Sequence, residues 1–347
     1  MLIPYREHFP IQSGHADIAD SAALIGRTRV GSGLVLRALA TLRADGESIT
    51  IGEDVFFDRR ATVHIADSVL PTKVGNEVTV GKFALVHACT LEDGVVVGDA
   101  AVVMDDASVG AYAVIAAGAL VAPRKKLAGG FLYAGNPAGP VRAISRDEAR
   151  QWAAAMRRDA AAEPVLDSDI PPDVLADVEL ALAAGARPQC ADAYVAPTAC
   201  VVGEVVIGAE AGIYFGCVVA AGDSRIEIGP GTNIQDNSVL VTNRARGELR
   251  IGSGVTVGHN TRIGAGIIGD DALVGMGAEL ADGVTVEAGG CVGARAHVER
   301  GTVVESGWIW AGRPARAFRP LKPAERALFA GFRDVYIRYA SDYRQGV

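Results

Sequence analysis

The sequence has few aromatic residues, few cysteines and no cluster of basic residues. Aromatics make up 6% of the 347 residues while half of the residues are apolar, so we expect a core built mainly from Ala, Val, Ile and Leu. The net charge is -8, and the runs of basic residues are all short, such as Arg124-Lys125-Lys126. A nucleic-acid binder needs basic clusters that neutralise phosphates, and this class is therefore excluded.

The sequence also lacks the features of membrane and secreted proteins. No apolar stretch approaches the roughly 20 residues of a membrane span. The first residues, MLIPYREHFP, do not have the charged-then-apolar pattern of a signal peptide. The five cysteines are odd in number and none has C-x-x-C spacing, which argues against a disulfide framework. We therefore expect a protein of the reducing cytoplasm that does not bind membranes.

An aliphatic residue recurs at every sixth position along much of the chain. One series runs through Val97, Val103, Val109, Ile115 and Val121, and another through Ile251, Val257, Ile263 and, after a one-residue contraction, Ile268 and Val274. Helices and pleated strands have periods of 3.6 and 2, so neither explains a period of six. A chain that turns a corner every six residues does. Three such faces make one coil, and stacked coils share a continuous aliphatic core.

The hexapeptide pattern occurs twice. The segment Ala134–Ala138 reads AGNPA, and Ala311–Ala315, which lies 177 positions later, reads AGRPA. At this offset the two halves align without a gap from about residue 18 to about residue 148. We predict an all-β fold with flanking helices: two tandem left-handed parallel β-helices, each followed by a C-terminal α-helix. The predicted domains are 1–165 and 189–347, joined by a linker at 166–188 that contains a short helix.

Each predicted β-helix is followed by a helix with its own start signal. The first begins with the capping box Ser145-Arg146-Asp147-Glu148 and carries Trp152 and Met156 on one face. The second begins near Pro323. Its apolar stripe is expected to pack against a face of the β-helix and consists of Leu328, Phe332, Val335, Tyr336 and Tyr339.

Two segments carry a resemblance to a known family. Cys217–Leu240 reads CVVAAGDSRIEIGPGTNIQDNSVL, and Val255–His259 reads VTVGH. These segments resemble the γ-class carbonic anhydrases and their hexapeptide-repeat relatives, and the resemblance covers both halves of the chain. In that family three histidines bind one metal ion, usually zinc. The first and third ligands come from one β-helix and the second comes from its neighbour, so the site lies at an interface.

The two halves complement each other at these ligand positions. The first half has His64, Lys82 and His87, and the second half has Val241, His259 and Gly264. The first half thus keeps the two ligands that one β-helix supplies, and the second keeps the ligand that the neighbour supplies. The resemblance implies one metal site made by His64, His87 and His259, with Zn²⁺ as the expected ion and Fe²⁺ or Co²⁺ as alternatives. Alternatively, both copies have lost the metal and these histidines are remnants.

The ion pairs that the family places near its metal are divided in the same way. Of the Arg/Asp combination, Arg43 survives only in the first half and Asp236 only in the second. The resemblance therefore implies an Arg43–Asp236 pair, which again needs the two halves in contact. The alternative is that both residues are solvated surface charges. Lys82 is interpreted as an ammonium that fills the place of a lost metal ion.

Five further residues are candidates for catalysis. Gln235, Asn233 or Asp58 could orient a water molecule or the substrate beside the metal. Asp67 follows His64 by three residues, near where some relatives carry an acidic proton shuttle, and Glu47 is a second candidate for that role. The favoured interpretation of both carboxylates is that they are plain surface residues.

Three functions follow from this reading. The first is a zinc-dependent lyase or hydrolase, which would hydrate CO2 or act on another small carbonyl substrate with zinc-activated water. The second is a hexapeptide acyltransferase that uses acyl-CoA, and the third is a catalytically inactive scaffold. Because the single-domain relatives are trimers of β-helices, we expect a homo-oligomer in which first and second halves contact each other.

Overall fold

The computed structural model describes residues 1–159, 175–176, 178–179 and 192–346. The chain divides into two compact units, Met1–Val165 with Gly346–Val347 and Leu166–Gln345, and each is described by itself. The predicted linker at 166–188, its short helix and Cys190 lie almost entirely outside the described residues. The predicted domain boundaries therefore stay predictions.

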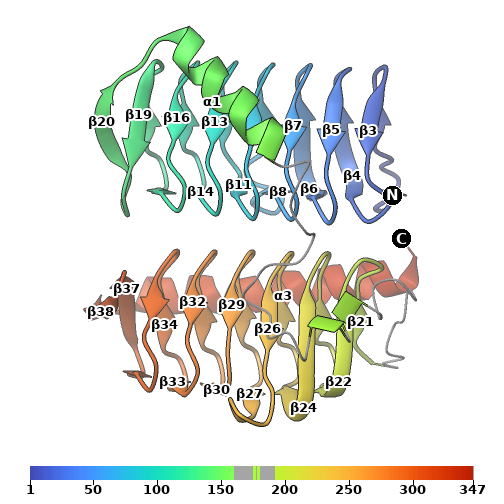
Figure 1. Cartoon of the computed structure of the whole chain (residues 1–347). Coiled ribbons are helices and arrows are strands. Elements are labelled where there is room, and N and C mark those ends of the chain that lie inside the picture. The colour runs from blue at the N-terminus through green and yellow to red at the C-terminus, as the bar shows by residue number, and fades with distance from the viewer. Residues whose placement is uncertain (160–174, 177, 180–191, 347) are drawn as a thin grey trace. The chain divides into compact units, whose positions relative to one another are not determined.

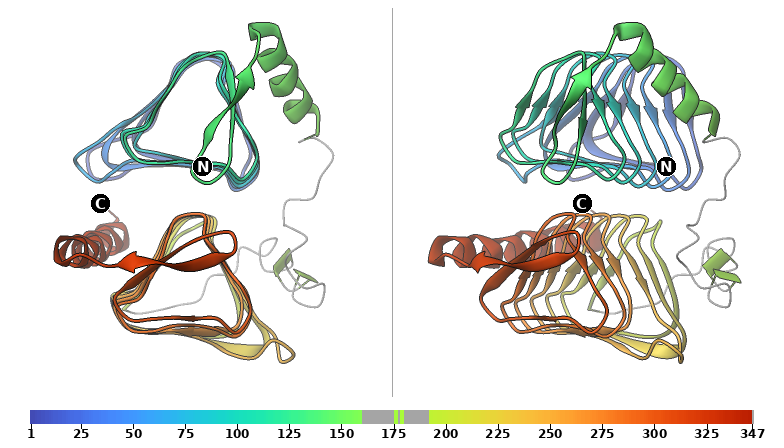
Figure 2. Two further views of the ribbon diagram at one scale, coloured as in Figure 1. Left: turned by 90° about the vertical axis from the view of Figure 1, so that its left-hand side faces the viewer. Right: turned by 60° about the vertical axis from the view of Figure 1, so that its left-hand side comes forward.

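The first unit is a three-sided β-helix of parallel strands (Figures 1 and 2). Its first face contains β8 (Thr62–His64), β11 (Leu85–His87), β14 (Val102–Val103) and β17 (Leu120–Val121). Its second face contains β9 (Thr72–Val74), β12 (Thr90–Leu91), β15 (Ser108–Val109) and β18 (Lys126–Leu127). The long strand β6 (Thr41–Ile51) belongs to both faces, because its first part pairs with β8 and its last part pairs with β9.

The third face completes each triangular coil of the first unit. It contains β3 (Ala16–Ile18), β5 (Leu34–Leu36), β7 (Phe56–Phe57), β10 (Thr79–Val80), β13 (Val96–Val97), β16 (Val114–Ile115), β19 (Phe131–Ala134) and the antiparallel β20 (Gly139–Ala143). Three further strands precede or pair with the first coils: the short strands β1 (Leu2–Ile3) and β2 (Ile11–Gln12), and the longer β4 (Ala23–Val30).

The second unit has the same three-sided architecture. Its first face contains β26 (Val239–Val241), β29 (Arg262–Ile263), β32 (Glu279–Leu280) and β35 (His297–Val298). Its second face contains β27 (Leu249–Ile251), β30 (Gly266–Ile268), β33 (Val284–Val286) and β36 (Val303–Val304), and β24 (Val218–Ile228), paired with β22 (Cys200–Ile207), joins these two faces. Its third face contains β21 (Tyr194–Val195), β23 (Gly212–Ile213), β25 (Asn233–Ile234), β28 (Thr256–Val257), β31 (Leu273–Val274), β34 (Cys291–Val292), β37 (Trp308–Gly312) and β38 (Ala315–Pro320).

The aliphatic residues of the hexapeptide series form the core of each unit. Val103, Val109 and Ile115 are fully buried, as are Val257 and Val274 in the second unit. The prediction of stacked coils with one inward aliphatic side chain per face is therefore confirmed. Burying these side chains stabilises each unit by roughly 25 cal/mol for every Å² of apolar surface removed from water.

The first helix, α1 (Arg146–Asp159), begins as the capping box predicts. The backbone N–H of Glu148 donates to Oγ of Ser145 at 3.1 Å, which satisfies one of the donors left over at a helix start. Met156 packs with buried Ala149 against the third face of the first unit. Trp152, which we expected on the same apolar face, is 43% exposed.

The second helix, α3 (Pro323–Gln345), packs against the second unit through only part of its predicted stripe. Tyr336 and Tyr339 are buried as expected, since this end of the helix lies on β21, β23 and β25. The packing role predicted for Leu328 and Phe332 is wrong, because both are exposed. The beginning of α3 faces the sheet with Phe329 and Ala330 instead. Within the part of the chain that the structure describes, no helix combines the length and hydrophobicity of a membrane crossing.

Candidate metal centre

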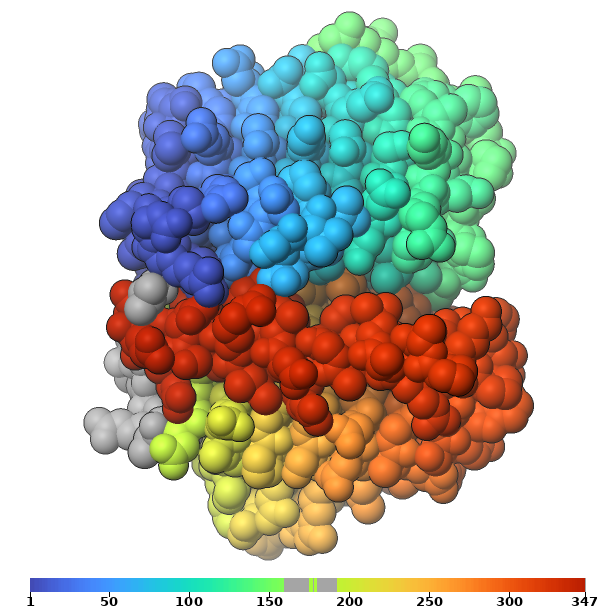
Figure 3. All heavy atoms as spheres, turned by 180° about the vertical axis from the view of Figure 1, so that it is seen from behind, coloured from blue at the N-terminus to red at the C-terminus, as the bar shows by residue number. Residues whose placement is uncertain are grey.

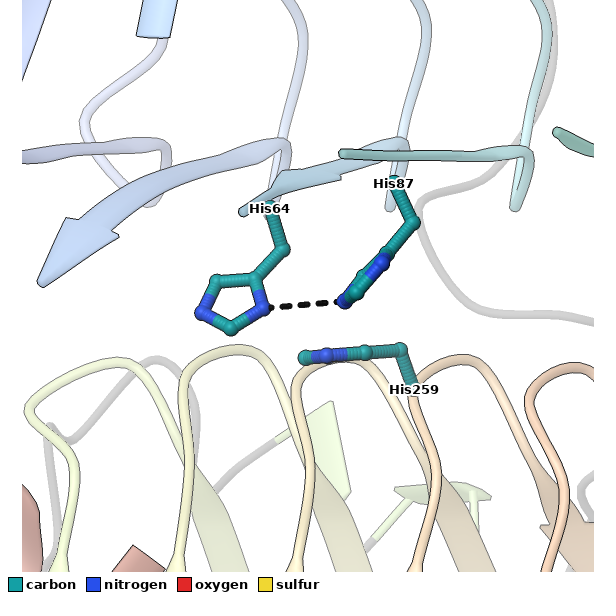
Figure 4. A group of neighbouring side chains, drawn as sticks. All are labelled: His64, His87 and His259. Carbon is teal, nitrogen blue, oxygen red and sulfur yellow. Dashed lines mark hydrogen bonds between the residues drawn. The ribbon is translucent and has the colours of Figure 1, made fainter. Parts of the chain in front are cut away.

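Two histidines of the first unit stand side by side on neighbouring coils. His64 ends β8, His87 ends β11, and the two residues are direct partners in the parallel pairing of these strands. Figure 4 shows their imidazole rings pointing toward each other, with a dashed line between them. This line joins Nδ1 of His64 to Nε2 of His87 at 3.3 Å.

A carboxylate lies behind each of these two rings. Nε2 of His64 lies 3.1 Å from Oδ1 of Asp45, and Nδ1 of His87 lies 2.5 Å from Oδ1 of Asp105. Asp45 also binds the guanidinium of Arg43, and both of these side chains are fully buried. Carboxylates in this position fix the tautomer and ring orientation of metal-binding histidines. The two nitrogens that face each other are therefore the ones directed at a shared point.

The separation of the two facing nitrogens suits a shared metal ion. Tetrahedral zinc with Zn–N distances of about 2.05 Å places two nitrogen ligands roughly 3.3–3.4 Å apart. An ordinary hydrogen bond between nitrogen and its acceptor is shorter, at about 2.9–3.0 Å. The observed 3.3 Å between His64 and His87 agrees with the first value. The donor set of the first unit thus fits two adjacent ligands of one ion.

The second unit holds one histidine in a comparable setting. His259, also drawn in Figure 4, lies at the corner that follows β28 and is fully buried. Its Nδ1 lies 3.1 Å from Oδ2 of Asp236, whose Oδ1 accepts a hydrogen bond from the backbone N–H of Phe215 at 3.0 Å. The hydroxyl of Tyr336, on α3, lies 3.3 Å from Nε2 of His259. The Asp236 carboxylate thus lies beside Nδ1 of His259, and Nε2 is the other ring nitrogen, beside the Tyr336 hydroxyl.

Asn233 and Gln235 form a short hydrogen-bonded chain in the second unit. Nε2 of Gln235 donates to Oδ1 of Asn233 at 3.0 Å. Nδ2 of Asn233 in turn donates to Oγ1 of Thr256, its partner on β28, at 3.0 Å. Asn233 therefore holds Gln235 in place, which makes Gln235 the better candidate for contact with a ligand.

Three other predicted site residues lie in the first unit with local partners. Oδ1 of Asp58 accepts a hydrogen bond from the backbone N–H of the next residue, Arg59, at 2.6 Å. Asp67 lies at the corner after β8, and its backbone carbonyl accepts from Glu47 at 2.7 Å. Arg43 is paired with Asp45. The predicted Arg43–Asp236 pair stays a prediction.

The positions of the second unit that correspond to His64 and His87 carry no polar side chain. Ala220, Val241 and Gly264 occupy the ladder that carries Arg43, His64 and His87 in the first unit. A side chain at Gly264 would clash with Oδ1 of Asp282. In the first unit the position of His259 is Lys82, whose backbone N–H donates to Asp99.

Two residues of the centre were missed in the sequence. Asp105 lies one coil beyond His87, and a search one coil ahead of each ligand would have found it. Tyr336 was recognised only as part of an apolar stripe, because the register of α3 against β28 has no signal in the sequence. Cys89, two residues after His87, is packed in the hydrophobic core. Burial is the main cause that raises the pKa of its thiol, and the nearby Asp105 carboxylate raises it further.

Comparison with known proteins identifies the family. No family model matches the chain. A carbonic anhydrase of Geobacillus kaustophilus is 33% identical over 161 residues, which cover 88% of that protein and 46% of this chain. The chain belongs to the γ-carbonic anhydrase-like family of hexapeptide-repeat proteins. Mitochondrial γ carbonic anhydrase 2 of Arabidopsis thaliana is 42% identical over 154 residues.

The matches to this family differ in how much of each relative they cover. The chain spans 55% of the length of the Arabidopsis protein, and the match covers 43% of this chain. Among solved structures, a hexapeptide transferase family protein of Anaplasma phagocytophilum is 33% identical with a TM-score of 0.39, and the match covers 98% of that chain and 44% of this one. Each of these three matches covers less than half of this two-unit chain.

Proposed function

We propose that this protein is a metal-dependent, carbonic anhydrase-like enzyme whose metal site is shared by a first and a second unit. His64 and His87 would supply two ligands, and His259 of a second unit would supply the third. The observation that carries this proposal is the pair of facing nitrogens on His64 and His87, each ring backed by a carboxylate. Zinc is the ion that three imidazoles with an open fourth position suit best.

In the proposed reaction, the protein's own residues position the metal ligands and the substrate. A bound zinc ion would lower the pKa of a coordinated water molecule to about 7. Asp45, Asp105 and Asp236 lie beside one ring nitrogen of each imidazole and would favour the tautomer whose other nitrogen binds the ion. The Tyr336 hydroxyl, beside Nε2 of His259, and the amide of Gln235 would hydrogen-bond oxygen atoms of the substrate. CO2 is the first substrate to test, because relatives are named carbonic anhydrases.

The proposal requires contact between unlike units. A ring of first units alone would combine His64 and His87 with Lys82, and a ring of second units alone would combine His259 with Val241 and Gly264. Neither set provides three ligands. The unlike units that meet can belong to one chain or to two copies in a homo-oligomer. A cytoplasmic location stays a prediction.

Metal content per chain tests the proposal. Native protein, purified without a chelator and without nickel-affinity chromatography, should contain about one zinc ion per chain when measured by elemental (inductively coupled plasma) mass spectrometry. His64→Ala and His259→Ala should each lose that ion, since either removes a ligand. His297→Ala is the matched control and should keep it, because His297 binds Glu279 outside the proposed ligand set. Stopped-flow CO2 hydration should fall in parallel with the metal.

Other stoichiometries would contradict the proposal. Two ions per chain would show that each unit completes its own site despite Lys82 and Val241. No metal, even after zinc supplementation, would show that the histidines are remnants. The acyltransferase and scaffold functions would then be tested next with acyl-CoA and with association assays.

A further inference from the structure

The helix and the third face pack tightly in the first unit. Tyr112 fills the space between α1 and the sheet, next to Val96, Val114 and Met156. The guanidinium of Arg146 lies 4.5 Å from the centre of the Tyr112 ring. On the same side, Arg150 binds Glu77 at 2.8 Å and closes the edge of this contact.

The same contact is open in the second unit. At the fixed offset between the halves, Tyr112 corresponds to Gly289, Glu77 to Gly254, Ala149 to Arg326 and Met156 to Arg333. These four residues line a groove of about 280 Å³ between α3 and the sheet. Leu273, Leu321 and Phe329 form its apolar lining. Figure 3 shows α3, in red, at the surface of the molecule.

The groove results from a coupled exchange of residues. In the first unit, Gly94 leaves room for the Tyr112 ring, since a side chain at Gly94 would clash with that ring. In the second unit the corresponding pair is Asp271 and Gly289, and a Cβ at Gly289 would meet open space. Tyr112 adopts a φ of 56° and Gly289 a φ of 65°, so this corner does not itself require glycine. The glycine therefore keeps space open, in addition to adopting this left-handed φ without strain.

The two arginines of the groove have different partners. Arg333 is paired with Asp271 and Asp334, both at 3.2 Å. Arg326 makes no ion pair with any residue that the structure describes, and its guanidinium lies against Gly307 at the groove. An arginine without a carboxylate partner, next to an aromatic and two leucine side chains, offers two N–H donors and an apolar surface together.

We propose that this groove binds a small carboxylic acid with a hydrocarbon body. The carboxylate would take two hydrogen bonds from Arg326, and the body would lie on Phe329 and Leu273. The volume of the groove suits a ligand smaller than the usual drug-sized molecule. The site lies within the second unit and does not use the proposed metal ligands.

Benzoate binding to the full chain, followed by calorimetry, tests this inference. Benzamide, which has the same shape without the charge, should bind at least about tenfold more weakly, because the charge-assisted bonds are lost. Arg326→Ala places the first unit's residue at this position and should weaken benzoate binding by at least about tenfold. Gly289→Tyr should abolish it by filling the groove as Tyr112 does.

Two controls separate this site from the rest of the protein. Arg300→Ala removes an exposed arginine of the same unit that does not line the groove, and benzoate binding should not change. His259→Ala should also keep benzoate binding, since a carboxylate held at the metal would be lost in that variant. Three results would overturn the inference. Benzamide could bind as tightly as benzoate, the Arg326→Ala variant could bind benzoate as tightly as the wild type, or benzoate could fail to bind at about 10 mM. Arg326→Ala keeps the test decisive if Gly289→Tyr does not fold.

Discussion

Nδ1 of His87 lies 2.5 Å from Oδ1 of Asp105, which comes from the next coil of the first unit. We predict that Asp105→Asn lowers zinc affinity about 10–100-fold, because removing such a partner loosens the ring and makes it less basic. Competition with a chelator would measure the change. Asp106→Asn, one residue further along, is the control and should leave the affinity unchanged. Equal affinities of the Asp105→Asn variant and the wild type would show that this contact does not support metal binding.

Lys82 occupies the position in the first unit that His259 occupies in the second. We predict that Lys82→His adds no second metal ion, because the ladder that would have to face it carries Val241 and Gly264 in the second unit. Elemental analysis of the variant should still give about one ion per chain. A second ion would show that the histidine finds other ligands, for example between two first units.

The described cysteines are buried, and their thiols should be unreactive. The pKa of Cys291 is raised to about 12, mainly by burial and in smaller part by the nearby Glu325 carboxylate. Since the thiolate is the reactive form, iodoacetamide at pH 8 should leave Cys89 and Cys291 unmodified in the native protein and modify both after denaturation. Peptide mass spectrometry would measure this. Rapid modification of Cys291 in the native state would contradict its burial.

The stability contributed by the start of α3 should fall at acidic pH. A side-chain hydrogen bond from Arg319, then the backbone N–H of Lys322, lower the pKa of Glu325 to about 2. A carboxylate whose pKa is lowered by folding stabilises the protein above its ordinary pKa of 4.5, and this contribution is lost as the pH falls toward 2. Glu325→Gln should therefore lower the melting temperature slightly at pH 7 and not at pH 2. The same small loss at both values would indicate a packing effect instead.

The sequence alone predicts the coils because their physical cause is repetitive. Every sixth residue, such as Val103 or Val257, must be aliphatic to fill the interior, and this requirement is visible without coordinates. The offset between the halves then aligns His64 with Val241 and so divides the ligand positions between the units. The strand pairing of His64 with His87 follows from the same stacking.

Contacts made by the helices could not be predicted in this way. A helical stripe indicates which side of α3 is apolar, but not which strands lie beneath each turn. Phe332 was therefore expected to be buried although it is exposed, and the contact of Tyr336 with His259 was missed. The groove at Gly289 also depends on the distance between α3 and the sheet, which is set by tertiary packing.

The stacking of coils in the first unit gives His64 and His87 a fixed backbone spacing. Neighbouring parallel strands lie about 4.8 Å apart, and this backbone spacing, together with the ring orientations that Asp45 and Asp105 support, sets the distance between His64 and His87. A histidine at Met104, one coil further on, would have its backbone about 9.6 Å from that of His64, which is twice the spacing of the observed pair. The ladder thus fixes the points from which the two rings extend, and rotation of the side chains adjusts the separation of their facing nitrogens to the ion.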